Sequence, residues 1–206
     1  AAALDAGAIV LVMATVGDAA VRAWSERLAG AGVAVVDAPV SGGVARAAAG
    51  ELLVMAAGAQ ADLARVQPLI DALAASAPVV GSACGDGQRM KLVNQLLCGV
   101  HIVAAAEALS FAESLGLDPR AAWEVVRGGA ANSFMLDDRG ARMLEEEPPV
   151  RSAVDIFVKD MGLVVDAAEA AGHEPVLARA ARAVYTAARE QGLGRRDDSA
   201  VIRTYR

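Results

Sequence analysis

The chain has 206 residues, of which 55% are hydrophobic, only 3% are aromatic and 21% are charged, and its formal net charge is -6 at pH 7. This acidic balance argues against a nucleic-acid partner, because phosphate backbones are bound by clustered basic side chains. Charges interrupt the apolar stretches and no basic leader precedes an apolar core, so we expect neither a membrane span nor a secretory signal. The expected location is the cytoplasm, and the length suits one full domain plus part of another.

The first predicted element lies in residues 7–16, an apolar run that ends near Thr15. On spacing alone, a threonine at such a place is usually a helix cap, here for a helix that begins near Asp18. A strand-helix pattern continues to about Val80, and helical patterns dominate from residue 85 onward.

A glycine-rich turn divides the next apolar stretch. Residues 33–37 are apolar and β-branched and predict a strand, Ser41, Gly42 and Gly43 predict a turn, and residues 52–55 predict a second strand. Such a turn brings backbone amides close to an anion, so a carboxylate ligand would fit there. An ordinary glycine turn between two strands is the alternative.

A second motif, residues 85–95, leads into a long predicted helix that runs to about Leu115. Lys91, Asn94 and Gln95 lie three and four residues apart, so they project from neighbouring positions on one helical face. An amine on a flexible stem is a good proton shuttle when partial burial lowers its pKa. The alternative is a solvated surface lysine.

Apolar residues at helical spacing surround a third motif, Lys159 and Asp160, in residues 154–163. Adjacent opposite charges on a helix are usually two solvated residues, which is the alternative to a binding role. Further helices are predicted after residues 118–119, after a loop at 148–149 and after a break at 172–175. The arginines at 195 and 196 precede two aspartates, and this segment predicts a solvated loop.

Together these motifs resemble the β-hydroxyacid dehydrogenases, the family of 3-hydroxyisobutyrate dehydrogenase and, more distantly, 6-phosphogluconate dehydrogenase. The resemblance implies an oxidoreductase that transfers hydride between NAD, or NADP, and the hydroxyl-bearing carbon of a small hydroxy acid. It implies that Lys91 is the catalytic acid and base. The implied substrate contacts are Ser41, Gly42, Gly43, Asn94 and Gln95, and the implied cofactor contacts are Thr15 and Lys159.

Three positions depart from the pattern of the family. Gln95 stands where the family has a second asparagine, Ala14 where it has a serine, and Ser152 where it often has an aromatic residue. Gln95 and Ser152 would suit a polar, hydroxylated substrate. Four segments together resemble the L-threonate dehydrogenase branch of the family, namely residues 91–97, 132–133, 152–160 and 197–202. The alternatives are 3-hydroxyisobutyrate dehydrogenase and tartronate semialdehyde reductase.

The resemblance also implies an α/β and then all-α fold. Residues 1–84 would form the C-terminal part of a Rossmann-type domain, and residues 85–206 a helical domain like that of 6-phosphogluconate dehydrogenase. No Gly-x-Gly-x-x-Gly follows a strand in this chain, and that fingerprint is where a dinucleotide's pyrophosphate meets a helix N-terminus. We therefore expect the chain to begin partway through its cofactor domain.

The expected partner is a small hydroxy acid, and the resemblance implies a homodimer or homotetramer formed through the helical domain. A non-catalytic helical dimerisation module is the alternative from a different class, because half of a Rossmann sheet leaves an unpaired edge. Cys84, Cys98, His101 and His173 have no metal-ligand company in the sequence, so we expect no metal.

Overall fold

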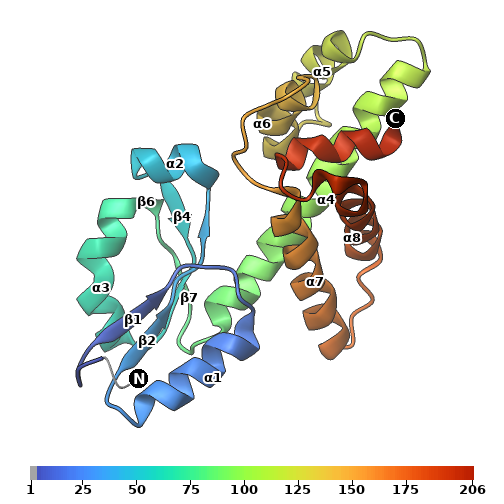
Figure 1. The fold of residues 1–206 in the computed structure, drawn as a ribbon. Coiled ribbons are helices and arrows are strands. Elements are labelled where there is room, and N and C mark those ends of the chain that lie inside the picture. The colour runs from blue at the N-terminus through green and yellow to red at the C-terminus, as the bar shows by residue number, and fades with distance from the viewer. Residues whose placement is uncertain (1–3) are drawn as a thin grey trace. The chain divides into compact units, whose positions relative to one another are not determined.

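The structure is a computed structural model that describes residues 4–206 (Figure 1). The chain divides into two compact units, Ala1–Asn94 and Gln95–Arg206, here called unit 1 and unit 2. Unit 1 mixes strands and helices and unit 2 is helical, so the predicted order of an α/β and then an all-α region is confirmed. The division falls inside one long helix, which contributes residues to both units.

Unit 1 contains two small sheets with helices between their strands. Its elements are β1 (Ile9–Val12), α1 (Asp18–Ala29), β2 (Ala34–Asp37), β3 (Val40–Ser41), α2 (Gly43–Ala49), β4 (Leu52–Val54), β5 (Ala56–Ala57), α3 (Gln60–Leu73), β6 (Ala74–Ser76) and β7 (Val79–Gly81). The strand orders are β1-β2-β5-β7 and β3-β4-β6. The strands β1 and β2 are parallel and α1 connects them, which is a βαβ unit.

Helices α1 and α3 cover opposite faces of the first sheet. Val35 belongs to a cluster with Val21 of α1, whereas its neighbour Val36 belongs to a cluster with Ile70 of α3. Successive strand residues point to opposite faces, so a continuous apolar strand is what burial on both faces requires. Figure 1 shows β1 and β2 between α1 and α3.

The predicted strand-turn-strand pattern over residues 33–55 is wrong in its middle part. A short strand ends at Ser41, and Gly43–Ala49 then forms the helix α2 before β4 begins. Alanine fills most of this segment and has the highest helix propensity, which explains the extra helix. Gly50 ends it in the left-handed conformation that glycine adopts without strain.

Unit 2 is built from helices whose ends follow the sequence signals. They are the long helix α4 (Asp86–Ser114), which begins in unit 1, α5 (Pro119–Arg127), α6 (Phe134–Met143), α7 (Val154–Ala170), α8 (Val176–Ala188), η1 (Arg189–Leu193) and η2 (Asp198–Tyr205). The Asp118 carboxylate accepts a hydrogen bond from the Arg120 amide and caps α5, and proline occupies the first helical position. The predicted helices after residues 118–119, 148–149 and 172–175 are confirmed.

Tyr185 of α8 is the largest fully buried side chain of unit 2. Its ring stacks on Phe157 of α7 with centroids 5.2 Å apart, and its hydroxyl donates to the Gly99 carbonyl of α4 at 3.1 Å. Burial raises the pKa of Tyr185 well above its usual value. One aromatic side chain thus connects three helices.

Among residues 4–206, α4 is the one helix whose length and composition would let it cross a membrane. That observation is weak by itself, because the core helix of a water-soluble enzyme passes the same test. Ile102, Ala106 and Leu109 are buried within the protein, which is what a core helix shows.

The predicted solvated loop at residues 195–198 is wrong for its two aspartates, which are buried. Arg142 of α6 donates from Nε to Asp197 at 3.0 Å, and Arg139 donates to Asp198 at 3.0 Å. The arginine partners lie on another helix, so no local sequence pattern predicts these pairs. These pairs fix η2 against α6.

The two aspartates respond differently to burial. Burial alone would raise the pKa of Asp197, but hydrogen bonds from Ser199, the Arg151 amide and Arg142 outweigh it and lower that pKa. For Asp198 burial prevails over the Arg139 guanidinium, so the pKa of Asp198 is raised. Asp197 therefore stabilises the folded state as an anion.

We predict that Asp197→Asn lowers the free energy of unfolding by about 1.5–3 kcal/mol at pH 7, because the Arg142 guanidinium loses one of its two carboxylate hydrogen-bond partners and keeps Asp138. The folded-state pKa of Asp197 lies below its unfolded value, so this stabilisation is complete above about pH 4 and is lost as the pH falls through the folded pKa. Denaturant unfolding of the wild type and the variant from pH 7 to pH 2.5 measures the difference between their free energies of unfolding. A difference that does not become smaller at low pH would contradict this account.

A second prediction concerns two glycines inside helices of unit 2. A Cβ added at Gly140 of α6 would lie 2.4 Å from the buried Trp123 indole, whereas one at Gly162 of α7 would meet nothing within 4 Å. Gly140→Ala should therefore destabilise by about 1–3 kcal/mol, and Gly162→Ala should stabilise by up to about 1 kcal/mol. Thermal unfolding of the two variants compares them directly, and an equal shift in both would be inconsistent with tight packing at Trp123.

Candidate functional site

The chain contains only two lysines, Lys91 and Lys159, against 17 arginines, and both lysines are predicted site residues. An arginine stays protonated in proteins, whereas a lysine loses its proton readily when it is desolvated. Lys91 is only 6% exposed, so the alternative of a solvated surface lysine is wrong. The Lys159 side chain is 50% exposed.

Lys91 and Gln95 occupy the buried side of α4. Both are 6% exposed and lie four residues apart, whereas Val93 between them is 60% exposed. Asn94 is half-buried next to Gln95. Lys91, Asn94 and Gln95 therefore lie at neighbouring positions along one side of α4, three and four residues apart, as the spacing predicts.

A buried carboxylate holds the start of α4. Asp37 is fully buried at the end of β2, and its Oδ2 accepts from the backbone amides of Gly85 at 3.0 Å and Gln88 at 2.9 Å. A negative charge at this position is favourable, because the first amides of a helix have no partners within the helix. Gly87 comes so close that an added Cβ would lie 2.7 Å from the Met55 carbonyl oxygen.

Gln88 connects this helix start to the loop that carries Thr15. Its Nε2 donates to Asp37 Oδ1 at 2.9 Å and to the Ala14 carbonyl at 3.1 Å. Its Oε1 accepts from the Val16 amide at 2.9 Å and the Gly17 amide at 3.0 Å. Thr15 is half-buried, and Gly17, rather than Thr15, is the N-cap of α1.

The sequence patterns predicted no role for Asp37 or Gln88. Each was part of a motif, but neither had a visible partner, because their contacts span 51 residues. A charged residue that directly follows a buried β-branched strand was the available signal, since such a charge must find hydrogen bonds when it is buried.

The Ser-Gly-Gly segment has a backbone that only glycine adopts easily. Gly42 has φ 136° and Gly43 has φ 70°, both in the region that L side chains rarely enter. A Cβ at Gly42 would also lie 2.9 Å from Arg46. Ser41 ends β3, where it pairs with Leu53, so the segment leaves a sheet edge and enters α2 directly through Gly42.

In unit 2, Asp160 contacts two predicted site residues, Gln95 and Lys159. Its Oδ2 accepts from Gln95 Nε2 at 2.5 Å, and its Oδ1 lies 2.7 Å from the Lys159 ammonium. Asp160 is 2% exposed, so the alternative of two solvated charges is wrong for this residue. A buried carboxylate with charged and amide donors fixes both partners in place.

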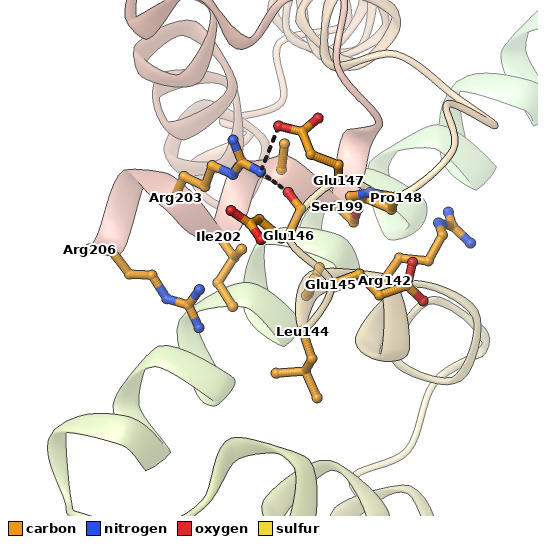
Figure 2. A pocket seen from close by; sticks show the side chains of 12 residues that line it. Arg142, Leu144, Glu145, Glu146, Glu147, Pro148, Ser199, Ile202, Arg203 and Arg206 are labelled. Atoms are coloured by element: carbon orange, nitrogen blue, oxygen red, sulfur yellow. Dashed lines mark hydrogen bonds and ion pairs between the residues drawn. The ribbon is translucent and has the colours of Figure 1, made fainter.

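Unit 2 also contains a cavity of about 430 Å³ that involves none of the predicted site residues (Figure 2). It lies between the end of α6, residues 144–148 and η2. Arg203 donates to the Glu146 carbonyl and pairs with Glu147, as the dashed lines in Figure 2 show. Within residues 4–206, no group of three His, Cys, Asp or Glu side chains could hold a metal ion.

Two family profiles cover nearly the whole chain. The one described as NAD-binding of NADP-dependent 3-hydroxyisobutyrate dehydrogenase matches residues 85–205, and the one described as the NAD binding domain of 6-phosphogluconate dehydrogenase matches residues 1–84. These matches define an NAD(P)-binding dehydrogenase.

Individual relatives agree with the profiles. The L-threonate dehydrogenase of Escherichia coli O6:H1 is 41% identical over 98% of this chain and 67% of that protein, and the one of Cupriavidus necator is 41% identical over 100% and 69%. A crystal structure of 3-hydroxyisobutyrate dehydrogenase from Salmonella typhimurium superposes with a TM-score of 0.93 at 40% identity and covers 98% of this chain and 70% of that one. The chain belongs to the 3-hydroxyisobutyrate dehydrogenase-like family of NAD(P)-dependent hydroxyacid dehydrogenases.

Proposed function

We propose that this chain is the substrate-side portion of an NAD-dependent L-threonate dehydrogenase in which Lys91 is the catalytic acid and base. The observation that carries the proposal is the burial of Lys91 on the same face of α4 as Gln95, in a chain whose other basic side chains, apart from Lys159, are all arginines. The L-threonate dehydrogenases that are 41% identical to the chain support the substrate.

In this proposal, the Lys91 amine accepts the hydroxyl proton of the substrate during oxidation and returns it during reduction. Asn94 and Gln95 orient the substrate's oxygens. Asp160 holds the Gln95 amide, so that amide is presented in one orientation. The nicotinamide, when bound, supplies the hydride acceptor.

The proposed carboxylate site is the bend at Ser41, Gly42 and Gly43. The serine hydroxyl and consecutive backbone amides are suitable donors for an anion. The two positive φ angles make this backbone costly for any other residue, which supports a role that needs a close backbone approach.

The chain offers two groups for the cofactor, Thr15 and Lys159. The loop that carries Thr15 follows β1, and residues 38–43 follow β2, which is parallel to β1. Both segments therefore leave the carboxyl ends of neighbouring parallel strands, where α/β sheets bind their ligands. Lys159 has an ammonium fixed by Asp160 and a half-exposed side chain, which fits a contact with a polar cofactor.

Two other substrates and one other class of function remain candidates. The similar crystal structure from Salmonella typhimurium is that of a 3-hydroxyisobutyrate dehydrogenase, and a tartronate semialdehyde reductase would use the same groups. A non-catalytic helical dimerisation module would explain the exposed Phe111, Leu115 and Leu117 but not the buried Lys91.

We further propose a domain boundary after residue 84, where the two family profiles meet. A cytoplasmic homodimer or homotetramer, associated through the helical region, fits the exposed apolar side chains of α4.

The substrate prediction is tested with the chain and with a version extended upstream by a first βαβ unit. We expect NAD-dependent oxidation by the extended version, with kcat/KM highest for L-threonate. Gln95 and Ser152 favour hydroxylated substrates over 3-hydroxyisobutyrate, and the similarity to the 41% identical L-threonate dehydrogenases favours L-threonate over D-glycerate. A preference for 3-hydroxyisobutyrate would instead support the 3-hydroxyisobutyrate dehydrogenase branch of the family. No oxidation of any of the three acids would contradict the enzymatic proposal.

The same substitution at the two lysines separates their roles. Lys91→Arg keeps the charge but cannot give up its proton, so we expect kcat to fall by about 10²–10⁴-fold. Lys159→Arg keeps an ion pair with Asp160, so it should mainly raise the KM for NAD. Wild-type kcat in Lys91→Arg, with folding checked by circular dichroism, would remove Lys91 from the mechanism.

A further inference from the structure

We infer that Gln88, together with Asp37, is a positioning residue that holds the loop carrying Thr15 and the helix carrying Lys91 at one fixed separation. The inference rests on the proposed function, which gives Thr15 its cofactor contact and Lys91 its proton. All the residues concerned belong to unit 1.

The Gln88 amide has no unused hydrogen-bonding position. It is fully buried, its oxygen accepts two backbone hydrogen bonds and its nitrogen donates two. A flipped amide would point its hydrogens at the Val16 and Gly17 amides and its oxygen at the Asp37 carboxylate, so only one orientation is satisfied. Through this side chain, the position of residues 14–17 and the position of the first turn of α4 depend on each other.

Other side chains at this position cannot make the same contacts. Asparagine is one methylene shorter, leucine has the volume without the polar atoms, and glutamate would place a second carboxylate within about 3 Å of Asp37. In the leucine variant, the part-buried Val16 amide and the buried Gly17 amide would lose their acceptor, which is costly for groups with little or no contact with water.

The catalytic consequence follows from the short distance along the helix. Lys91 lies three residues after Gln88, so the two share one turn of α4. A change in the first turn moves Lys91, and a change in residues 14–17 moves Thr15. A displacement of about 1 Å between reacting groups costs on the order of 10²-fold in rate.

The test compares Gln88→Leu with Gln67→Leu, a matched change at an exposed glutamine of the same unit whose amide binds only Asp71. In the extended version of the chain, Gln88→Leu should lower kcat by about 10²-fold and raise the Kd for NADH, measured by fluorescence titration, while the KM for the hydroxy acid changes little. Amide exchange of residues 14–17 should speed up and that of α3 should not. Gln67→Leu should match the wild type in every readout.

A second set of variants at Gln88 and Asp37 tests the same contact if Gln88→Leu does not fold. Gln88→Glu should lose activity because two carboxylates meet. Asp37→Asn combined with Gln88→Glu should recover part of that loss, by about 10-fold, because an amide donor again faces a carboxylate while the Ala14 carbonyl still lacks its donor. Values of kcat and Kd for NADH that are equal in Gln88→Leu and Gln67→Leu, or a double variant no better than Gln88→Glu, would overturn the inference. Failure of the proposed function gives a different result, namely wild-type turnover in Lys91→Arg.

Discussion

The buried carboxylate of Asp37 is the constraint on which the rest of unit 1 depends. A charge removed from water costs several kcal/mol unless hydrogen bonds replace its hydration. Asp37 obtains those bonds from the Gly85 amide, the Gln88 amide and the Gln88 side chain, all at the start of α4. The end of β2 and the start of α4 are therefore joined at one point.

This joint explains why three distant motifs share one unit. The Ser-Gly-Gly bend begins four residues after Asp37, the Thr15 loop is bound to Gln88, and Lys91 lies one turn further along α4. In the proposed function, these motifs supply anion binding, cofactor contact and proton transfer, in that order. In unit 2, Asp160 plays a similar part for Gln95 and Lys159. In both units, a buried carboxylate bonds to groups next to, or among, the residues to which the proposed function gives roles.

The sequence predicted the parts of the fold that local patterns control. Helix boundaries at Asp118, around residues 148–149 and at residues 172–175 follow from proline and glycine chemistry, and the structure confirms them. The helix α2 was missed because the turn was expected to return directly to a strand, although alanine fills the segment. Asp197 and Asp198 were misjudged because their partners Arg139 and Arg142 lie on another helix.

In the candidate site, too, local patterns predicted some features and missed those that depend on distant segments. Spacing on one helix was enough to group Lys91, Asn94 and Gln95, because a helical face is a local property. The burial of Lys91 and the contacts of Gln88 depend on segments that lie far apart in the sequence, and no periodicity reveals them. The resemblance to a family supplied the role of each motif, and the structure supplied the groups that hold the motifs in place.

The most direct test of the central claim is a crystal structure of the extended chain with NADH and L-threonate bound. The account predicts the Lys91 amine within about 2.6–3.2 Å of the hydroxyl on the reacting carbon, the substrate carboxylate on Ser41, Gly42 and Gly43, and the four Gln88 hydrogen bonds intact. A substrate bound with its carboxylate elsewhere and its reacting hydroxyl out of reach of Lys91 would contradict the account.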